Sequence, residues 1–451
     1  MREWESRPIC LGFAAVALGL SVLVSWWHLL FLIPLLYFMQ KKRSRLILLI
    51  GAGVGVLLSP PQTDLILSNS TFDGVVDVIS VPMDGKKDRS AIVDSKGVRY
   101  VMRLEFNSPV CMGDRIRLKG QLSPILPGSY PTRGVVGVLR PLGRVEVLSS
   151  GSPIWKLGMK IRESFVRMVD RSIPDTGAEI ANALCFNVTS GLTSEDYDNL
   201  QKTGTTHVIS TSGMHVVITA AMLLFLMSLV PIPRALQLAI VIVFLLVYAG
   251  AAGFRPPIVR AVVMTSVGLV AYLGAKEPDG LSAWAAAGLT YLILDPYTIT
   301  DVGFILSMAA SGSLMLFMGH VEVHEWKWTD WLKGLARASL VVTLICAPLV
   351  AYYFGRVSLV GILANLIIEP MVTIVVWGAL TAWLLSGILP FLSVGLLSEV
   401  VGPTSVGIDR VLAHMASWPM ASIDTPTFSA YWLTLFYAAV LMIWRPSVRQ
   451  A

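Results

Sequence analysis

Long apolar runs alternate with short charged segments over most of this chain. Three runs open the sequence, at residues 9–24, 27–39 and 46–58, and further runs follow residue 206 almost to the C-terminus. A bilayer-spanning helix needs about 20 mainly apolar residues. We therefore predict transmembrane helices in residues 1–60 and a second transmembrane domain in residues 206–451.

A different pattern occupies residues 61–152. Apolar and polar residues alternate there in short runs punctuated by Gly, Pro and Asp, as in Asp114-Arg-Ile-Arg-Leu-Lys-Gly120. Alternation with period two is typical of β-strands that bury one face. Five or six short strands predict a small barrel such as the OB-fold. The predicted fold class is a polytopic α-helical membrane protein with a small extracytoplasmic β-barrel domain.

Residues 153–205 form a helical, partly amphipathic linker in this interpretation. The basic residues of its first helix are Lys156, Lys160, Arg162, Arg167 and Arg171. One reading is an interfacial helix that anchors the barrel to lipid headgroups. The other is a basic rim for a phosphate chain.

Composition supports the membrane assignment, because only 14% of residues are charged and 55% are hydrophobic, whereas soluble domains carry about 25% charged residues. The basic segment 41–45 and the basic C-terminal tail are expected in the cytoplasm by the positive-inside rule. Both termini are thus predicted to be cytoplasmic and the barrel external. The four widely spaced cysteines predict neither a disulfide framework nor a metal site.

Polar residues at membrane depth are costly and mark candidate functional sites. The first group follows Thr206 and consists of His207, Ser210, Thr211, Ser212, Gly213 and His215. If this segment is helical, His207, Thr211 and His215 share one face. The group lines a hydrated path, or it is a helix start whose hydroxyls bond neighbouring helices.

The second group is Gly-Ala-Ala-Gly-Phe-Arg-Pro-Pro-Ile-Val-Arg, residues 250–260. Its glycines and prolines predict a helix break. Arg255 and Arg260 bracket that break in the sequence, and guanidinium groups bind phosphate well. The alternative is a loop outside the membrane whose arginines extend to the interface.

A third group is Asn365 and Glu369, four residues apart and followed by Pro370. An amide and a carboxylate in an apolar run predict a discontinuous helix beside a cavity, or a polar pair that joins two helices. Glu369 would repel DNA if ionised, so it is assigned to structure or gating. Asp301 and Ser307 form a weaker set with a structural or gating role, and Asp301 could cap a helix.

The chain resembles the ComEC competence family. The stretches that carry the resemblance are Ala181-Asn-Ala-Leu184, Thr203-Gly-Thr-Thr-His207, Ser210 to His215, Gly253-Phe-Arg-Pro256, Asp301 to Ser307, Ala364 to Pro370, and Phe72-Asp-Gly-Val-Val76 with Gly113 to Gly120 in the barrel. The resemblance implies inward passage of single-stranded DNA across a bacterial inner (cytoplasmic) membrane during natural transformation. It also implies an external DNA receptor and a cytoplasmic ATPase as partners, besides the lipid bilayer.

Many members of that family carry a C-terminal metallo-β-lactamase-like nuclease domain, and this sequence ends at Ala451 without its metal motif. The chain is then either a short-form member that uses a separate nuclease or none, or a piece of a longer protein. A homo-oligomer is a further possibility. No P-loop, zinc-protease or nucleophile-elbow motif occurs. We expect a non-enzymatic channel without a cofactor, in which Tyr100 or Phe106 could stack on bases. A transporter of a small anionic or lipid-linked substrate, and an intramembrane enzyme with His215 as a base, are the alternatives.

Overall fold

The structure is a computed structural model, and it describes residues 7–21, 42–59, 69–84, 88–105, 108, 110–125, 134–209, 213–274, 279–318 and 328–443. Its contacts divide the chain into two units. The first comprises Met1–Thr193, His207–Met308 and Glu369–Asp409. The second comprises Ser194–Thr206, Ala309–Ile368 and Arg410–Ala451.

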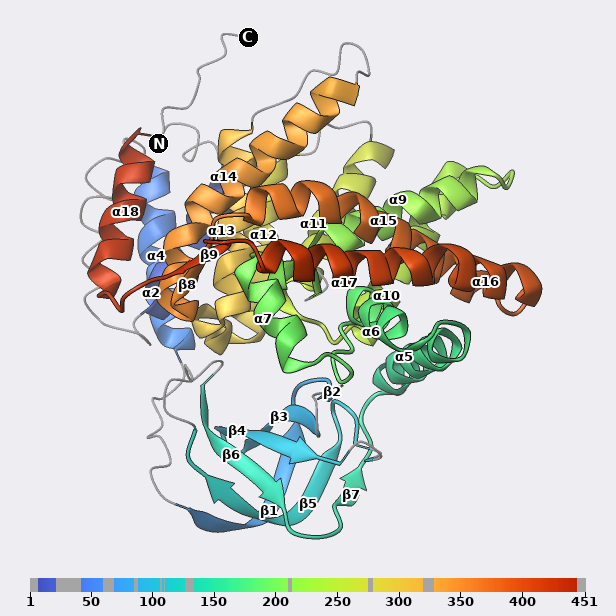
Figure 1. Ribbon diagram of the computed structural model, residues 1–451. Coiled ribbons are helices and arrows are strands. Elements are labelled where there is room, and N and C mark those ends of the chain that lie inside the picture. The colour runs from blue at the N-terminus through green and yellow to red at the C-terminus, as the bar shows by residue number, and fades with distance from the viewer. Residues whose placement is uncertain are drawn as a thin grey trace. The chain divides into compact units, whose positions relative to one another are not determined.

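Helices make up most of the described chain (Figure 1). Up to the middle of the sequence they are α2 (Pro8–Leu20), α4 (Lys42–Leu58), α5 (Pro153–Ser172), α6 (Asp175–Phe186), α7 (Ser194–Lys202), α8 (Thr206–Ile209) and α9 (Gly213–Ser228). The remaining ones are α10 (Arg234–Ala251), α11 (Pro256–Leu273), α12 (Gly280–Leu294), α13 (Val302–Phe317), α14 (Trp328–Phe354), α15 (Gly361–Leu385), α16 (Pro390–Leu396), α17 (Gly402–Ala416) and α18 (Ala430–Ile443). The 3-10 helix η3 (Pro296–Thr300) links α12 to α13, and the π-helical turn η4 (Leu397–Val401) links α16 to α17.

Five helical stretches among the described residues are long and apolar enough to cross a bilayer. They are Arg234–Ala251, Pro256–Leu273, Lys333–Phe354, Gly361–Leu385 and Pro390–Ala416. A membrane span must satisfy its own backbone hydrogen bonds, which an α-helix does. The predicted mostly helical, multi-pass membrane protein is confirmed, while the orientation of its termini stays a prediction.

Small residues bring α2 and α4 into backbone contact. A Cβ atom added to Gly55 would lie 2.9 Å from the Gly19 Cα atom and closer still to the Val16 carbonyl oxygen. Gly51 and Gly55 are four residues apart, so they lie on one face of α4. Small residues at this spacing allow membrane helices to approach closely.

The strands between α4 and α5 form a closed barrel. They are β1 (Ser70–Val78), β2 (Met83–Asp84), β3 (Arg89–Ser95), β4 (Val98–Leu104), β5 (Arg115–Ser123), β6 (Val135–Pro141) and β7 (Glu146–Ser149). Five of them pair in the ring β1-β3-β4-β6-β5, which the β1–β5 ladder closes from Ser70↔Leu122 to Asp77↔Arg115. The β4–β6 pair is parallel and the other ring pairs are antiparallel. The predicted small barrel is confirmed, and its strand number is that of the OB-fold.

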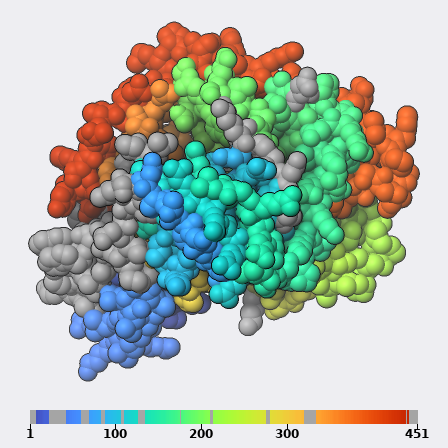
Figure 2. All heavy atoms as spheres, turned by 90° about the horizontal axis from the view of Figure 1, so that it is seen from below, coloured from blue at the N-terminus to red at the C-terminus, as the bar shows by residue number. Residues whose placement is uncertain are grey.

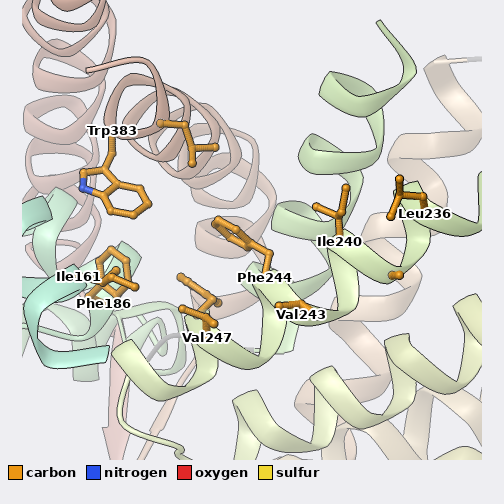
Figure 3. A pocket seen from close by; sticks show the side chains of 11 residues that line it. Ile161, Phe186, Leu236, Ile240, Val243, Phe244, Val247 and Trp383 are labelled. Atoms are coloured by element: carbon orange, nitrogen blue, oxygen red, sulfur yellow. The ribbon is translucent and has the colours of Figure 1, made fainter. Parts of the chain in front are cut away.

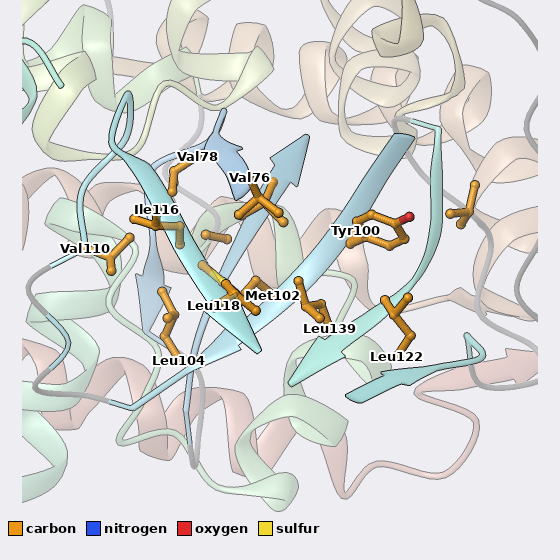
Figure 4. Packing of buried hydrophobic residues seen from close by; sticks show 13 residues of the cluster. Val76, Val78, Tyr100, Met102, Leu104, Val110, Ile116, Leu118, Leu122 and Leu139 are labelled. Atoms are coloured by element: carbon orange, nitrogen blue, oxygen red, sulfur yellow. The ribbon is translucent and has the colours of Figure 1, made fainter. Parts of the chain in front are cut away.

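The barrel core follows the alternation in the sequence. Ile116, Leu118 and Leu122 of β5 point inward, and Arg115 and Lys119 point outward. The inward side chains of the ring strands pack into one cluster (Figure 4). The barrel's outer surface is the cyan-to-teal region in the space-filling view (Figure 2).

The helix α5 follows the barrel and is attached to it. Arg162 is almost completely buried and donates a hydrogen bond from Nη2 to the Pro82 carbonyl at 3.2 Å. Arg162 thus belongs to the interior and not to a basic surface. Lys156, Lys160, Arg167 and Arg171 are exposed.

In the second unit, β8 (Arg356–Ser358) and β9 (Ser422–Asp424) form a two-stranded antiparallel sheet. Arg356 begins β8 and contacts Asp198 and Asp424 at 2.9 and 2.8 Å. The lysine of the i, i+4 pair Asp198–Lys202 lies 2.7 Å from the same aspartate. These hydrogen bonds, first that of Lys202 and then that of Arg356, lower the pKa of Asp198.

Candidate functional site

The turn between α10 and α11 is built from unusual backbone conformations. Gly253 and Phe254 have φ angles of 91° and 48°, and a positive φ is uncommon for a non-glycine residue. Two contacts hold Phe254 there: its carbonyl accepts a 2.6 Å hydrogen bond from the Tyr291 hydroxyl, and its ring meets the Trp155 ring edge-on at 4.8 Å. The turn is thereby fixed to α12 and α5.

The two arginines of this segment do not bracket the break. The chain leaves the helical path over residues 252–255, and Arg255 is the N-cap residue of α11. Pro256 and Pro257 begin α11, because proline is favoured at the first helical positions where its missing N–H costs nothing. Arg260 therefore lies inside α11, about one turn beyond Arg255.

Arg260 is the centre of the strongest cluster of predicted site residues. Its Nε atom donates to the Ser307 hydroxyl of α13 at 2.9 Å, and its Nη1 atom lies 4.0 Å from the Met264 sulfur. A Cβ atom added to Gly213, the first residue of α9, would lie 2.8 Å from Nη2. Three groups that are far apart in the sequence thus meet at one guanidinium.

The Arg260 guanidinium lacks a counter-charge in the described part of the chain. Its partners are a hydroxyl and a thioether, and no carboxylate of the described residues lies within 4 Å. The side chain projects from α11, one of the five long apolar helices, where an unneutralised charge is expensive. Such a site attracts an anion, because the planar fork of donors can bind one phosphate bidentately.

The histidines of the first predicted group lie in different surroundings. His215 of α9 is completely buried, and His207 of α8 is exposed. Ser210, Thr211 and Ser212 lie outside the described residues. The shared polar face of this group therefore stays a prediction, and Gly213 is a member of the group that lies against Arg260.

Asp301 has a structural part in the same region. Its Oδ1 atom accepts a hydrogen bond from the Phe304 backbone N–H at 2.9 Å, three residues later at the start of α13. This is the arrangement of a helix N-cap. The cap fixes the beginning of the helix that presents Ser307 to Arg260.

Asn365 joins helices of the second unit. Its Nδ2 atom donates to the Ser339 hydroxyl of α14 at 3.3 Å, and both residues are buried. The helix α15 runs unbroken through Pro370, unlike the predicted discontinuous helix. Glu369 is partly buried, and its backbone carbonyl accepts from the Thr373 hydroxyl at 3.0 Å.

The barrel lacks the aromatic platform that was expected at Tyr100. That side chain is only 9% exposed and lies in the barrel core (Figure 4). Its ring packs against the Phe72 ring, with 5.8 Å between the centroids. Phe106 lies outside the described residues. On the outer face of β5, Arg115 lies 3.5 Å from Asp77 and Lys119 lies 3.2 Å from Asp73, so two of the three basic side chains on this face are paired with carboxylates.

A contact between the barrel and the helices was missed by sequence reasoning. The Nη1 atom of Arg99 in β4 lies 2.8 Å from the Asp295 carboxylate, and its guanidinium stands 4.3 Å from the centroid of the Tyr297 ring. Gly134 leaves room for that ring, since a Cβ atom there would collide with it. In the sequence, Asp-Pro-Tyr before α13 indicates a turn in this segment, but it does not indicate the contact with Arg99.

All five long apolar helices lie in a region that matches a known protein family. A family model described as Competence protein matches residues 184–449. The chain is 28% identical to Competence protein ComA of Neisseria gonorrhoeae over 383 residues, which are 77% of this chain and 53% of that protein. It is 26% identical to ComE operon protein 3 of Bacillus subtilis over 215 residues, 48% of this chain and 27% of that protein.

A further relative is Recombination protein 2 of Haemophilus influenzae, 26% identical over 204 residues, 42% of this chain and 26% of that protein. The chain thus spans between 26% and 53% of the length of these relatives. No solved structure matches the chain. Since the family model covers more than half of its residues, the chain belongs to the competence protein family.

Proposed function

We propose that this protein conducts single-stranded DNA across the bacterial cytoplasmic membrane during natural transformation. Membership of the competence protein family supports this proposal, and the names of two relatives refer to competence and recombination. An external DNA receptor and a cytoplasmic ATPase would deliver and pull the strand, with a separate nuclease as a further partner. The chain itself would act as a conduit and not as an enzyme.

The observation that carries the proposal is the unneutralised guanidinium of Arg260 among apolar helices. Hydrocarbon excludes DNA, because each nucleotide carries a negative charge and the bilayer core offers no solvation. Arg260 supplies a positive charge there, its Nη2 atom has no hydrogen-bond acceptor among the described residues, and Ser307 and Gly213 fix its position. Passing phosphates would replace one another at this group while the strand moves.

We also assign His215 and Glu369 to the proposed path, because the helices that carry them, α9 and α15, are in contact. His215 lies half a turn from Gly213 on α9, and the Trp377 indole of α15 donates to the Ile218 carbonyl of α9 at 3.0 Å. Glu369 lies two turns before Trp377 on α15. We assign Glu369 a gating role, since an ionised carboxylate would repel the phosphate backbone.

The test uses the full chain in phospholipid vesicles and a fluorescent single-stranded oligonucleotide. Entry is measured as the fraction protected from added nuclease, under an inside-positive potential. We expect Arg260→Ala to reduce entry by roughly tenfold or more, because a charge-assisted hydrogen bond contributes about 1.5–3 kcal/mol. Arg260→Lys should retain an intermediate rate, since it keeps the charge but loses the fork.

The matched control is Arg167→Ala, an exposed arginine of α5 that pairs with Glu163 at 3.8 Å. It should leave entry unchanged. Equal entry in wild type and Arg260→Ala would overturn the assignment of this site. Vesicles that admit inorganic phosphate but exclude the oligonucleotide would instead establish a small-anion transporter, for which a single cation is equally suited.

A further inference from the structure

A concave apolar cavity lies between α5, α6, α10 and α15 of the first unit (Figure 3). Its volume is about 520 Å³, within the range of about 300–1,000 Å³ that is usual for ligand sites. Along one wall run Leu236, Ile240, Val243, Phe244 and Val247 of α10. The other walls are formed by Ile161, Phe186, Trp383 and Leu384.

One end of the cavity is a rigid aromatic wall. The Phe186 ring lies 4.8 Å from Phe165 and 5.5 Å from Tyr248, measured between centroids. The Tyr248 hydroxyl is turned away to donate to the Cys185 carbonyl at 2.7 Å. The cavity therefore offers almost no polar group to a water molecule, and a water needs several polar partners to stay.

The dimensions of the cavity fit one hydrocarbon chain. It follows α10 from Leu236 to Tyr248, twelve residues, which is about 18 Å at 1.5 Å per residue. This is close to half the thickness of a hydrocarbon core of about 30 Å. Over that length, a volume of 520 Å³ corresponds to a mean cross-section of about 29 Å². A helix about 10 Å across needs more than twice that area, so the cavity is too narrow for a helix.

Positive charge lies beside the aromatic end. The helix α5 crosses the C-terminal end of α10, where a Cβ atom on Gly158 would lie 3.1 Å from the Gly250 carbonyl carbon. Lys160 precedes Ile161 of the cavity wall, and Lys160, Arg167 and Arg171 are exposed on one face of α5. Among the residues described here, neither Lys160 nor Arg171 lies within ion-pair distance of a carboxylate.

We propose that this cavity is a specific site for an anionic phospholipid of the membrane. One acyl chain lies along α10 between α5 and α15, and Lys160 binds the headgroup phosphate. Arg171, about 16 Å further along α5, adds positive charge that attracts the anionic lipid. Basic groups next to a groove between membrane helices bind anionic headgroups in this way. The site is separate from the Arg260 cluster, so it does not depend on the proposed conduction of DNA.

The test uses the full chain in phosphatidylethanolamine vesicles that contain a phosphatidylglycerol with a photoreactive acyl chain. After illumination, mass spectrometry of the peptides locates the adducts. We expect them to concentrate on the wall formed by Phe244, Val247 and Trp383. The same photoreactive chain on phosphatidylcholine should label this wall several-fold less.

Two substitutions on α10 separate the site from general lipid contact. Val243 and Leu246 are both exposed, and only Val243 lines the cavity. Val243→Trp fills the cavity and should abolish the labelling, whereas Leu246→Trp should leave it unchanged. Lys160→Gln and Arg171→Gln leave the cavity intact, so they test the headgroup even if Val243→Trp does not fold. Each should lower the preference for phosphatidylglycerol about fivefold, the effect of one basic residue near a membrane surface.

Labelling spread evenly over all lipid-facing helices would overturn the proposal, because it would mean ordinary solvation by the bilayer. So would equal labelling in Val243→Trp and Leu246→Trp, or no loss of headgroup preference in the two glutamine variants. Cross-links from the wall to a second copy of the chain would show that the cavity belongs to an oligomer interface.

Discussion

The Nε atom of Arg260 donates a hydrogen bond to the Ser307 hydroxyl at 2.9 Å, and this bond joins α11 to α13 across 47 residues of sequence. A hydroxyl orients the guanidinium without neutralising it. The position of Arg260 is therefore set by packing, while its charge stays available to an anion. Substitutions that move the arginine without removing its charge can therefore test the site.

Gly213→Ala is such a substitution. The new methyl group would lie 2.8 Å from Nη2 of Arg260, so the end of this flexible side chain must shift. We expect DNA entry into vesicles to fall several-fold while the thermal unfolding midpoint changes little. Gly268→Ala on α11 is the control, since nothing lies within 4 Å of its added methyl group. A normal rate in Gly213→Ala would argue against a precise position for Arg260.

The contact between α2 and α4 predicts a difference between two glycines that are neighbours on α4. Gly55→Ala forces its methyl group against the backbone of α2, and overpacking of this kind typically costs about 1–3 kcal/mol. Gly53→Ala meets nothing within 4 Å and should be neutral or slightly stabilising, because alanine favours helix by about 0.5–1 kcal/mol. Thermal unfolding in detergent, followed by tryptophan fluorescence, measures both. Equal midpoints in the two variants would contradict the packing.

The ion pair between Arg99 and Asp295 is expected to hold the barrel to the helices. Its side chains are 15% and 25% exposed, so the pair is partly desolvated, and the Tyr297 ring adds a cation–π contact. A double-mutant cycle with alanine should give a coupling energy of about 1–3 kcal/mol. Arg103 and Asp88 form a more exposed pair from the same strand, and their cycle should give less than about 1 kcal/mol. Similar values for both cycles would refute a special role for Arg99.

Stability should depend on pH through Asp198. Its pKa in the folded protein is lowered from the ordinary value of 3.8 by Lys202 and Arg356. A lowered folded pKa means that the stabilisation is present above the unfolded value and is lost as the pH falls through the folded value. Asp198→Asn should therefore be less stable than wild type at pH 7, by under about 1 kcal/mol because the side chain is 44% exposed.

The difference between wild type and Asp198→Asn should disappear when thermal unfolding is repeated at a pH below the folded pKa. Glu195→Gln on the same helix serves as the control, since Glu195 is exposed and forms no ion pair among the described residues. A difference that persisted unchanged into strong acid would show that the carboxylate charge of Asp198 is not its cause.

Local patterns predicted the architecture because its signals lie within single segments. The alternation in residues 115–123 became β5 with its inward and outward faces, and the long apolar runs became α10, α11 and α15. Ring closure through β1 and β5 connects residues about fifty apart, and no local pattern encodes it. The same holds for the bond from Arg260 to Ser307, which needs the fold of three helices.

Proline and aromatic residues were the main sources of error. Pro370 was expected to interrupt a helix, yet α15 continues through it, since neighbouring groups in a packed helix bundle can replace the missing bond. Tyr100 has the chemistry of a stacking platform, but its place in the strand alternation turns it inward. For Arg162, a basic residue on an amphipathic helix, exposure was the natural expectation, and its bond to the Pro82 carbonyl joins residues eighty apart, which no local pattern encodes.

The closed ring of β1, β3, β4, β6 and β5 has a mechanical consequence. Each of these strands is hydrogen-bonded to a ring neighbour on both sides, so none can be unzipped from a free edge. Pulling any one of them out requires two ladders to rupture together. A load applied to one loop is therefore shared around the ring, and the barrel should withstand tension until it opens in a single step.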